Sequence, residues 1–116
     1  MDPTSIALGV SNICCGGIII LLAIPLVRRS VKPNQLYGVR FKASYASEEA
    51  WYDINQYGGQ RLILWSIPLV AIGIATLFLP LGSNIWAILL IACAPLIVII
   101  PAVESWRYAK SYPVSK

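Results

Sequence analysis

The chain has 116 residues, of which 58% are hydrophobic and only 12% are charged, with a net charge of +4. Soluble domains carry roughly 25% charged residues, and so short a chain has too little interior to hide this much apolar surface, so the composition excludes an ordinary water-soluble domain. The length predicts one domain, residues 1–116, and the composition predicts a protein of the lipid bilayer.

Three uncharged runs mark the predicted membrane helices. They cover about residues 6–27, 62–79 and 85–103, and each is close to the roughly 20 residues that a helix needs to cross the hydrocarbon core. The first run follows an acidic leader and precedes no small-residue cleavage site, so we expect a retained helix and not a signal peptide. The fold class is therefore all-α, with three transmembrane helices.

Small residues recur in the first run at a spacing of four. Ala7, Ser11 and Cys15 form this ridge, which would allow another helix to approach closely. Asn12 lies beside the ridge, and an amide in hydrocarbon needs a partner. We therefore expect Asn12 to hydrogen-bond another helix, with contact to a substrate as the alternative. The cysteines of the apolar runs predict no disulfide and no metal site.

A charged insert, residues 28–61, separates the first two runs and is predicted to contain a short helix. Ser47 is the expected N-cap, with Glu48 and Glu49 in the first turn at the positive end of the helix dipole. The pair Gly58 and Gly59 is expected to end the helix after about ten residues. Because both its ends join membrane helices, this amphipathic helix is predicted to lie in the cytoplasmic interface.

The two faces of the short helix have different predicted roles. Its apolar face, with Trp51 and Ile54, is expected to turn toward the bilayer or the helix bundle. Its acids, Glu49 and Asp53 among them, are expected to hold the guanidinium of Arg40 in a clamp between loop and helix. Paired carboxylates also suit cation binding or proton transfer, but no histidine or positioned nucleophile accompanies them. No catalytic, cofactor-binding or metal-binding residue is predicted, and we expect no enzyme.

The second and third runs contain prolines, and an acidic residue follows the third run. A short turn containing Pro and Gly joins these runs into an antiparallel hairpin. Pro68 and Pro95 lie inside them and are expected to kink the helices, Pro95 by depriving the carbonyl of Ile91 of its usual donor. A gating hinge is the alternative reading. Glu104, at the end of the third run, is expected to pair with Arg107.

The basic residues predict the orientation. All nine Lys and Arg residues lie within residues 28–61 or in the C-terminal tail, which ends in Lys116. The positive-inside bias therefore predicts a cytoplasmic insert and C-terminus and an external N-terminus. In this interpretation the basic residues are orientation anchors at the membrane surface, and no nucleic-acid partner is expected.

A spaced set of polar, aromatic and glycine residues runs through the insert: Asn34, Tyr37, Gly38, Arg40, Ser47, Glu48, Glu49, Trp51, Tyr52, Asn55, Gly58 and Gly59. The set resembles the cytoplasmic signature of the SdpI family of bacterial membrane immunity proteins, with Phe41 where that family usually has Thr. The resemblance implies a plasma-membrane protein of bacteria. The family's best-known member, which has additional spans, protects the cell from its own secreted toxic peptide and holds a transcriptional repressor at the membrane.

Two functions follow from these observations. The resemblance implies a non-enzymatic immunity or signalling protein that binds a peptide toxin or a cytoplasmic protein. The alternative is a small accessory subunit of a larger membrane complex, in which the ridge of the first run docks a partner helix. A transporter or channel would need ionisable residues at depth, and the apolar runs hold none.

Overall fold

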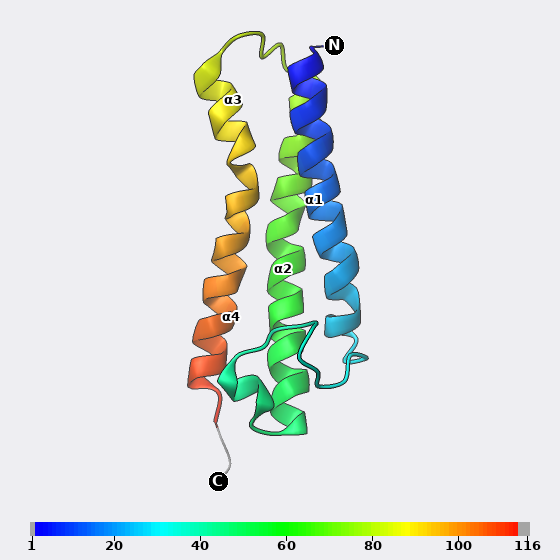
Figure 1. The fold of residues 1–116 in the computed structure, drawn as a ribbon, viewed down its shortest axis with the longest axis vertical. Helices are drawn as coiled ribbons and strands as arrows, with labels where there is room; N and C mark the ends of the chain where they lie inside the picture. The colour runs from blue at the N-terminus through cyan, green and yellow to red at the C-terminus, as the bar shows by residue number, and fades with distance from the viewer. Residues whose placement is uncertain (1, 114–116) are drawn as a thin grey trace.

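A computed structural model describes residues 2–113 of the chain (Figure 1). This part is helical and contains no strand, and it measures 58 × 23 × 20 Å. In chain order its elements are α1 (Pro3–Val27), the 3-10 helix η1 (Lys42–Tyr45), α2 (Glu48–Leu77), α3 (Ile85–Ala92), the 3-10 helix η2 (Ala94–Val98) and α4 (Ile99–Ser111). Three helical stretches, Pro3–Val27, Glu48–Leu77 and Ile85–Ser111, are long and apolar enough to cross a membrane.

The closest packing joins α1 and α2, which lie side by side and antiparallel (Figure 1). Small residues oppose each other at three levels, and on each helix they are spaced by seven: Gly9 with Gly73, Gly16 with Ser66, and Ala23 with Gly59. A Cβ atom at Gly73 would lie 2.8 Å from the carbonyl oxygen of Gly9. The two backbones therefore touch, as they do in membrane helix pairs that gain van der Waals contact through small residues.

The packing face of α1 differs from the predicted ridge. Ala7 and Ser11 are exposed and Cys15 is half-buried, whereas Gly9 and Gly16 are buried against α2. Residues spaced by four shift by about 40° around the helix at each step, so a ridge of them leaves one face. Residues spaced by seven return to nearly the same face after two helical turns. The small residues that pack within this chain are therefore those spaced by seven.

The third span is not a single α-helix, because Pro95 interrupts it. Around Pro95 the chain adopts the 3-10 conformation of η2 and then resumes as α4. The missing N–H of Pro95 frees the carbonyl of Ile91, and the side-chain amide of Asn12 on α1 donates to that carbonyl at 3.3 Å. The predicted interhelical hydrogen bond of Asn12 is therefore present, and it satisfies the acceptor that the proline leaves open.

The predicted interfacial helix is wrong in its extent. Ser47 caps α2 as expected, accepting the N–H of Ala50 at 2.9 Å, but the helix continues without a break through Gly58 and Gly59. A Cβ at Gly58 would lie 2.5 Å from Cγ2 of Val39, and one at Gly59 would meet the end of α1. These glycines allow close approach inside a long helix, and so they do not end it.

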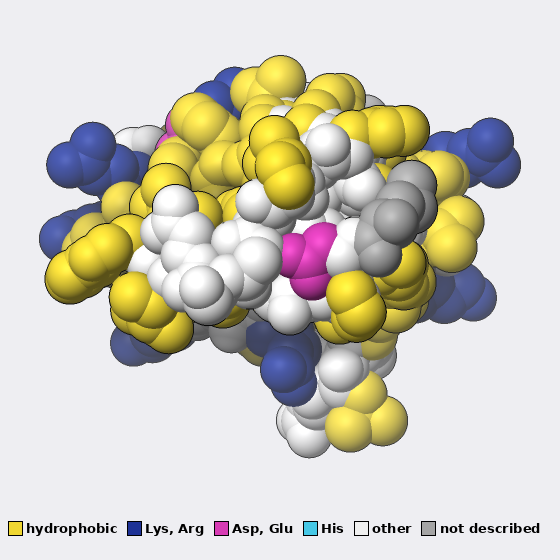
Figure 2. Space-filling view, turned by 90° about the horizontal axis from the view of Figure 1, so that it is seen from above, with side chains coloured by type: hydrophobic (Ala, Val, Ile, Leu, Met, Phe, Trp, Pro, Cys, Tyr) yellow, Lys and Arg dark blue, Asp and Glu magenta, His cyan; other side chains and the backbone are white. Residues whose placement is uncertain are grey.

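The two ends of the bundle differ in charge. Figure 2 views the end that carries the N-terminus, where hydrophobic and uncharged atoms dominate around an acidic side chain and most of the visible basic side chains project at the rim. Asp2 caps α1 by accepting the N–H of Thr4 at 2.9 Å, and it also accepts the N–H of Gly82. These N–H groups, Gly82 first, hold the pKa of Asp2 below its usual value. Lys116 lies outside the described residues.

Candidate functional site

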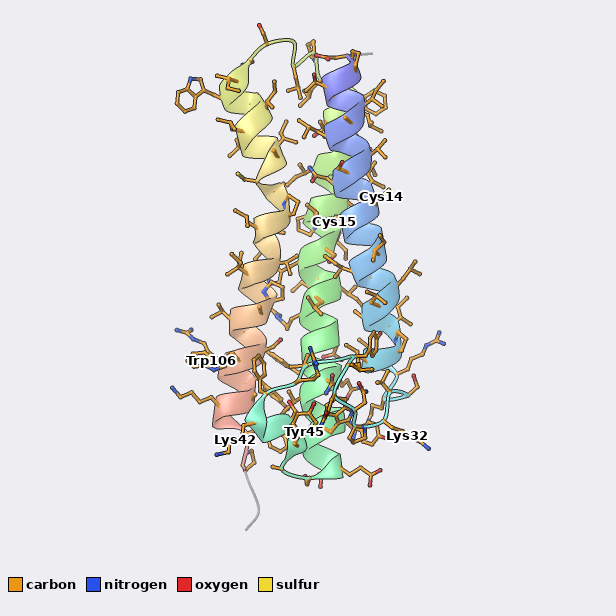
Figure 3. All side chains as sticks on the ribbon, viewed as in Figure 1. Cys14, Cys15, Lys32, Lys42, Tyr45 and Trp106 are labelled. Carbon is orange, nitrogen blue, oxygen red and sulfur yellow. The ribbon has the colours of Figure 1, made fainter. Side chains whose placement is uncertain are left out.

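The opposite end of the bundle carries a folded cap, formed by residues 28–47 and the first turns of α2 (Figures 1 and 3). Its first turn is organised by Asn34, whose side-chain oxygen accepts the N–H groups of Leu36 at 2.9 Å and Tyr37 at 2.7 Å. The Tyr45 hydroxyl donates to the Asn34 carbonyl at 2.6 Å. Asn34 therefore folds the loop locally, as Asn commonly does in turns.

Asn55 fixes the loop to α2. Its side-chain oxygen accepts the N–H of Val39 at 2.6 Å, and its amide donates to the carbonyls of Val39 at 3.3 Å and Trp51 at 2.9 Å. Gly38 has a φ of +116°, and a Cβ there would lie 2.5 Å from the Asn55 side-chain oxygen. Glycine is therefore required at position 38 both by the backbone conformation and by the space available.

Trp51 is the centre of the cap. Its side chain is fully buried, its indole N–H donates to the carbonyl of Val31 at 2.8 Å, and its ring lies 5.4 Å from that of Tyr45. Ile54 is equally buried, on the same side of the helix. The apolar face expected from the sequence therefore faces the protein, and it covers the loop that follows α1.

Asp53 has partners that the sequence did not predict. Its carboxylate forms an ion pair with Arg29 at 2.7 Å and accepts the hydroxyl of Tyr112 at 2.6 Å. The hydrogen bond to Asp53 raises the pKa of Tyr112 to about 12. Arg29 also lies over the ring of Tyr52, 5.5 Å from its centroid. Asp53 thus joins the first turns of α2 to the residues that follow α1 and α4.

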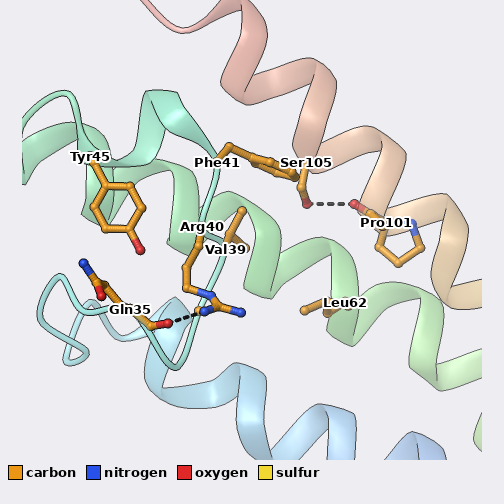
Figure 4. A pocket seen from close by; sticks show the side chains of 10 residues that line it. Gln35, Val39, Arg40, Phe41, Tyr45, Leu62, Pro101 and Ser105 are labelled. Atoms are coloured by element: carbon orange, nitrogen blue, oxygen red, sulfur yellow. Dashed lines mark hydrogen bonds between the residues drawn. The ribbon is translucent and has the colours of Figure 1, made fainter.

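The predicted clamp between Arg40 and these acids is therefore wrong. Val39 and Phe41 pack against the core of the cap, and successive side chains of an extended segment point to opposite sides, so Arg40 between them is directed outward. It is exposed, and its guanidinium donates to the backbone carbonyl of Gln35 (Figure 4). Within residues 2–113 no carboxylate forms an ion pair with Arg40.

Glu104 also differs from its predicted pairing with Arg107. It accepts two hydrogen bonds from the guanidinium of Arg61, at 3.0 and 2.5 Å, and a third from the indole of Trp65 at 2.8 Å. A bidentate carboxylate–arginine pair is stronger and more directional than the expected contact between neighbouring turns of one helix. It ties α4 to α2 where the cap meets the spans.

A cavity of about 630 Å³ opens beside Arg40. Side chains from the loop, α2 and α4 line it, among them Gln35, Arg40, Tyr45, Leu62, Pro101 and Ser105 (Figure 4). Within residues 2–113 no three His, Cys, Asp or Glu side chains come together as a metal site would require. The cavity offers a cation, hydrogen-bonding groups and apolar walls, which suit a peptide or side-chain ligand.

A sequence model of the SdpI/YfhL protein family matches residues 30–103, so it covers nearly all of the cap, α2 and most of the third span. The chain belongs to this family. No curated protein sequence and no solved structure shows significant similarity to it.

The structure separates the SdpI signature residues into two groups. The buried or half-buried group builds the cap: Asn34, Tyr37, Gly38, Trp51, Tyr52, Asn55, Gly58 and Gly59. The exposed group comprises Arg40, Ser47, Glu48 and Glu49. Of these, Ser47 caps α2 and Arg40 donates to the backbone of Gln35, whereas Glu48 and Glu49 lie in the first turn of α2. Sequence reasoning missed Arg29 and Tyr112, which lie outside the signature, 24 and 59 residues from Asp53 in sequence, and meet it only in the folded chain.

Proposed function

We propose that this SdpI-family protein is a non-enzymatic immunity or sensing protein of the bacterial plasma membrane. The family assignment and three membrane-spanning helices support this proposal. In it, the N-terminus is external and the cap is cytoplasmic, because the basic side chains among residues 2–113 lie in the cap sequence, in the first half of α2 or near the end of α4. The positive-inside bias then orients the bundle.

The binding surface proposed for a peptide toxin or a cytoplasmic protein is the face around Arg40. The carrying observation is that Arg40 is an exposed signature residue with no acidic partner among residues 2–113, beside a cavity of about 630 Å³. A guanidinium in this position can hold a carboxylate of a partner with two parallel hydrogen bonds, which Lys cannot reproduce. The buried signature residues would then serve to present this arginine on a rigid loop.

The test compares variants in cells that make the protein. Arg40→Ala, Arg40→Lys and the control Lys32→Ala would be purified gently from native membranes, and bound peptides and proteins identified by mass spectrometry. We expect Arg40→Ala and Arg40→Lys to fold and to lose on the order of tenfold or more of a bound partner, because a charge-assisted hydrogen bond is removed or weakened. Equal recovery of the partner from Arg40→Ala and Lys32→Ala preparations contradicts the proposal.

A second function, an accessory subunit of a larger membrane complex, is favoured by a different observation. Ala7 and Ser11 form an exposed small-residue ridge, and α3 has no buried residue. In this proposal a partner helix lies against the ridge of α1. The same purification distinguishes the two: a stoichiometric complex that Ser11→Leu dissociates and Arg40→Ala leaves intact supports the subunit function.

A further inference from the structure

A second hollow, which we call the η1–α4 groove, lies on the cap beside the Asp53 network, with Tyr112 belonging to both. It has a volume of about 730 Å³ and is mainly apolar. Its walls are aromatic, with Phe41 and Tyr45 on the loop side and Trp106 and Tyr112 on the α4 side. Ala109, which is almost completely buried, lines it on α4. The groove is therefore a preformed apolar slot between two elements that touch only lightly.

Two lysines line the groove, one from each element. Lys42 belongs to η1 and Lys110 to α4, and both are exposed. The ion pairs within residues 2–113 are Arg29–Asp53 and Arg61–Glu104, so neither lysine has a carboxylate partner there. The ammonium group of Lys110 lies 4.7 Å from the centroid of the Trp106 ring. Among the described residues, the groove thus presents two cations without an acidic partner beside aromatic surface.

An apolar stripe leads from the groove along α4. Ile99, Val103 and Trp106 are all exposed, and with Lys110 they recur at spacings of four, three and four, which places them on one face of the helix. This face belongs to a stretch long and apolar enough to cross a membrane. Toward the C-terminal end of α4, this face therefore carries apolar side chains, then an aromatic ring, and then a positive charge.

This order matches that of a phospholipid, in which acyl chains end in a charged headgroup. We propose that the η1–α4 groove binds the headgroup of an anionic phospholipid between Lys42 and Lys110, with an acyl chain along the exposed stripe of α4. Basic pockets at the ends of membrane helices recognise such headgroups, and tryptophan favours the same depth of the bilayer. Binding would join η1 to α4 and steady the loop that carries Arg40, independently of any peptide or protein partner.

Native mass spectrometry of the full chain in detergent tests the proposal. The protein would be mixed with equal amounts of phosphatidylglycerol and phosphatidylcholine that have identical acyl chains, and the retained lipids compared. We expect a preference for phosphatidylglycerol on the order of fivefold for each lysine and twentyfold or more for both. Lys42→Gln with Lys110→Gln should abolish this preference, and Lys32→Gln, which changes an exposed lysine outside the groove, should keep it.

A steric variant separates the groove from general surface charge. Ala46 is exposed and lines the groove, so Ala46→Phe should fill the space without disturbing the fold and should lower lipid retention while both lysines remain. Four results overturn the proposal: no preference in the unmodified chain, an equal loss in Lys32→Gln, undiminished retention in Ala46→Phe, or complete displacement of the lipid by inorganic phosphate. The last would show that the lysines recognise only a phosphate group.

Discussion

Replacing Asn55 tests whether the cap is held by the contacts that the structure shows. Asn55 is 2% exposed and makes both of the hydrogen bonds that fix Val39 to α2. In Asn55→Ala the N–H of Val39 loses its partner, which costs about 1–3 kcal/mol for a donor shielded from water, and the lost bonds of the amide group add about 1 kcal/mol. We therefore expect the free energy of unfolding to fall by about 2–4 kcal/mol.

Two further variants make the Asn55 experiment specific. Asn55→Asp keeps an oxygen for the N–H of Val39 but turns its second oxygen toward the carbonyls of Val39 and Trp51 at a buried site, so near neutral pH it should be at least as destabilising as Asn55→Ala. Gln60→Ala changes an exposed residue of the same helix and should cost less than about 0.5 kcal/mol.

Equilibrium unfolding in mixed detergent micelles measures the free energy, and amide hydrogen exchange measures the opening of residues 36–41. We expect exchange in this loop to accelerate in Asn55→Ala while the exchange of α1 residues stays unchanged. If Asn55→Ala and Gln60→Ala have equal stability and equal loop exchange, Asn55 does not anchor the loop, and the structural role of the signature is refuted.

Three other predictions concern the rest of the bundle. Gly73→Ala should destabilise the protein by about 1–3 kcal/mol because its Cβ would press on α1, whereas Gly17→Ala, with nothing within 4 Å, should be neutral or slightly stabilising; equal thermal stabilities would contradict the close contact. Glu104→Gln should lower the unfolding temperature by breaking the pair with Arg61, and an unchanged temperature would mean that this pair contributes nothing. The pKa of Asp2 is depressed, so its contribution to stability is present above about pH 4 and is lost as the pH falls further; Asp2→Asn should remove that acid sensitivity, and an identical acid profile for both proteins would exclude this origin.

The sequence alone was sufficient for the features that depend on neighbouring residues in the chain. Three apolar runs predicted three spans, since crossing the bilayer requires only length and hydrophobicity. Ser47 predicted the start of α2, because an N-cap acts on the N–H groups of the next turn. The burial of Trp51 and Ile54 followed from their common helix face, and the spaced motif of the insert was sufficient to indicate the family.

The glycines of the insert show what local sequence cannot determine. Gly58 and Gly59 suit either the end of a helix or a close contact, because both roles need the absence of a Cβ atom. In the structure both glycines allow close contact, because Val39 and the end of α1 occupy the space beside them. The same holds for the ridge of α1, whose packing face depends on the position of α2.

Charge pairing was decided only by the tertiary structure. Asp53 and Glu104 each had a basic residue nearby in sequence, yet the fold pairs them with Arg29 and Arg61, which lie 24 and 43 residues away. A long basic side chain can reach many positions, and the backbone path selects among them: the alternation of Val39 and Arg40 turns the guanidinium outward, away from the acids of α2. The sequence therefore determined which segments cross the membrane and where a helix begins, and the packing of those segments determined which charges are neutralised and which remain available to bind.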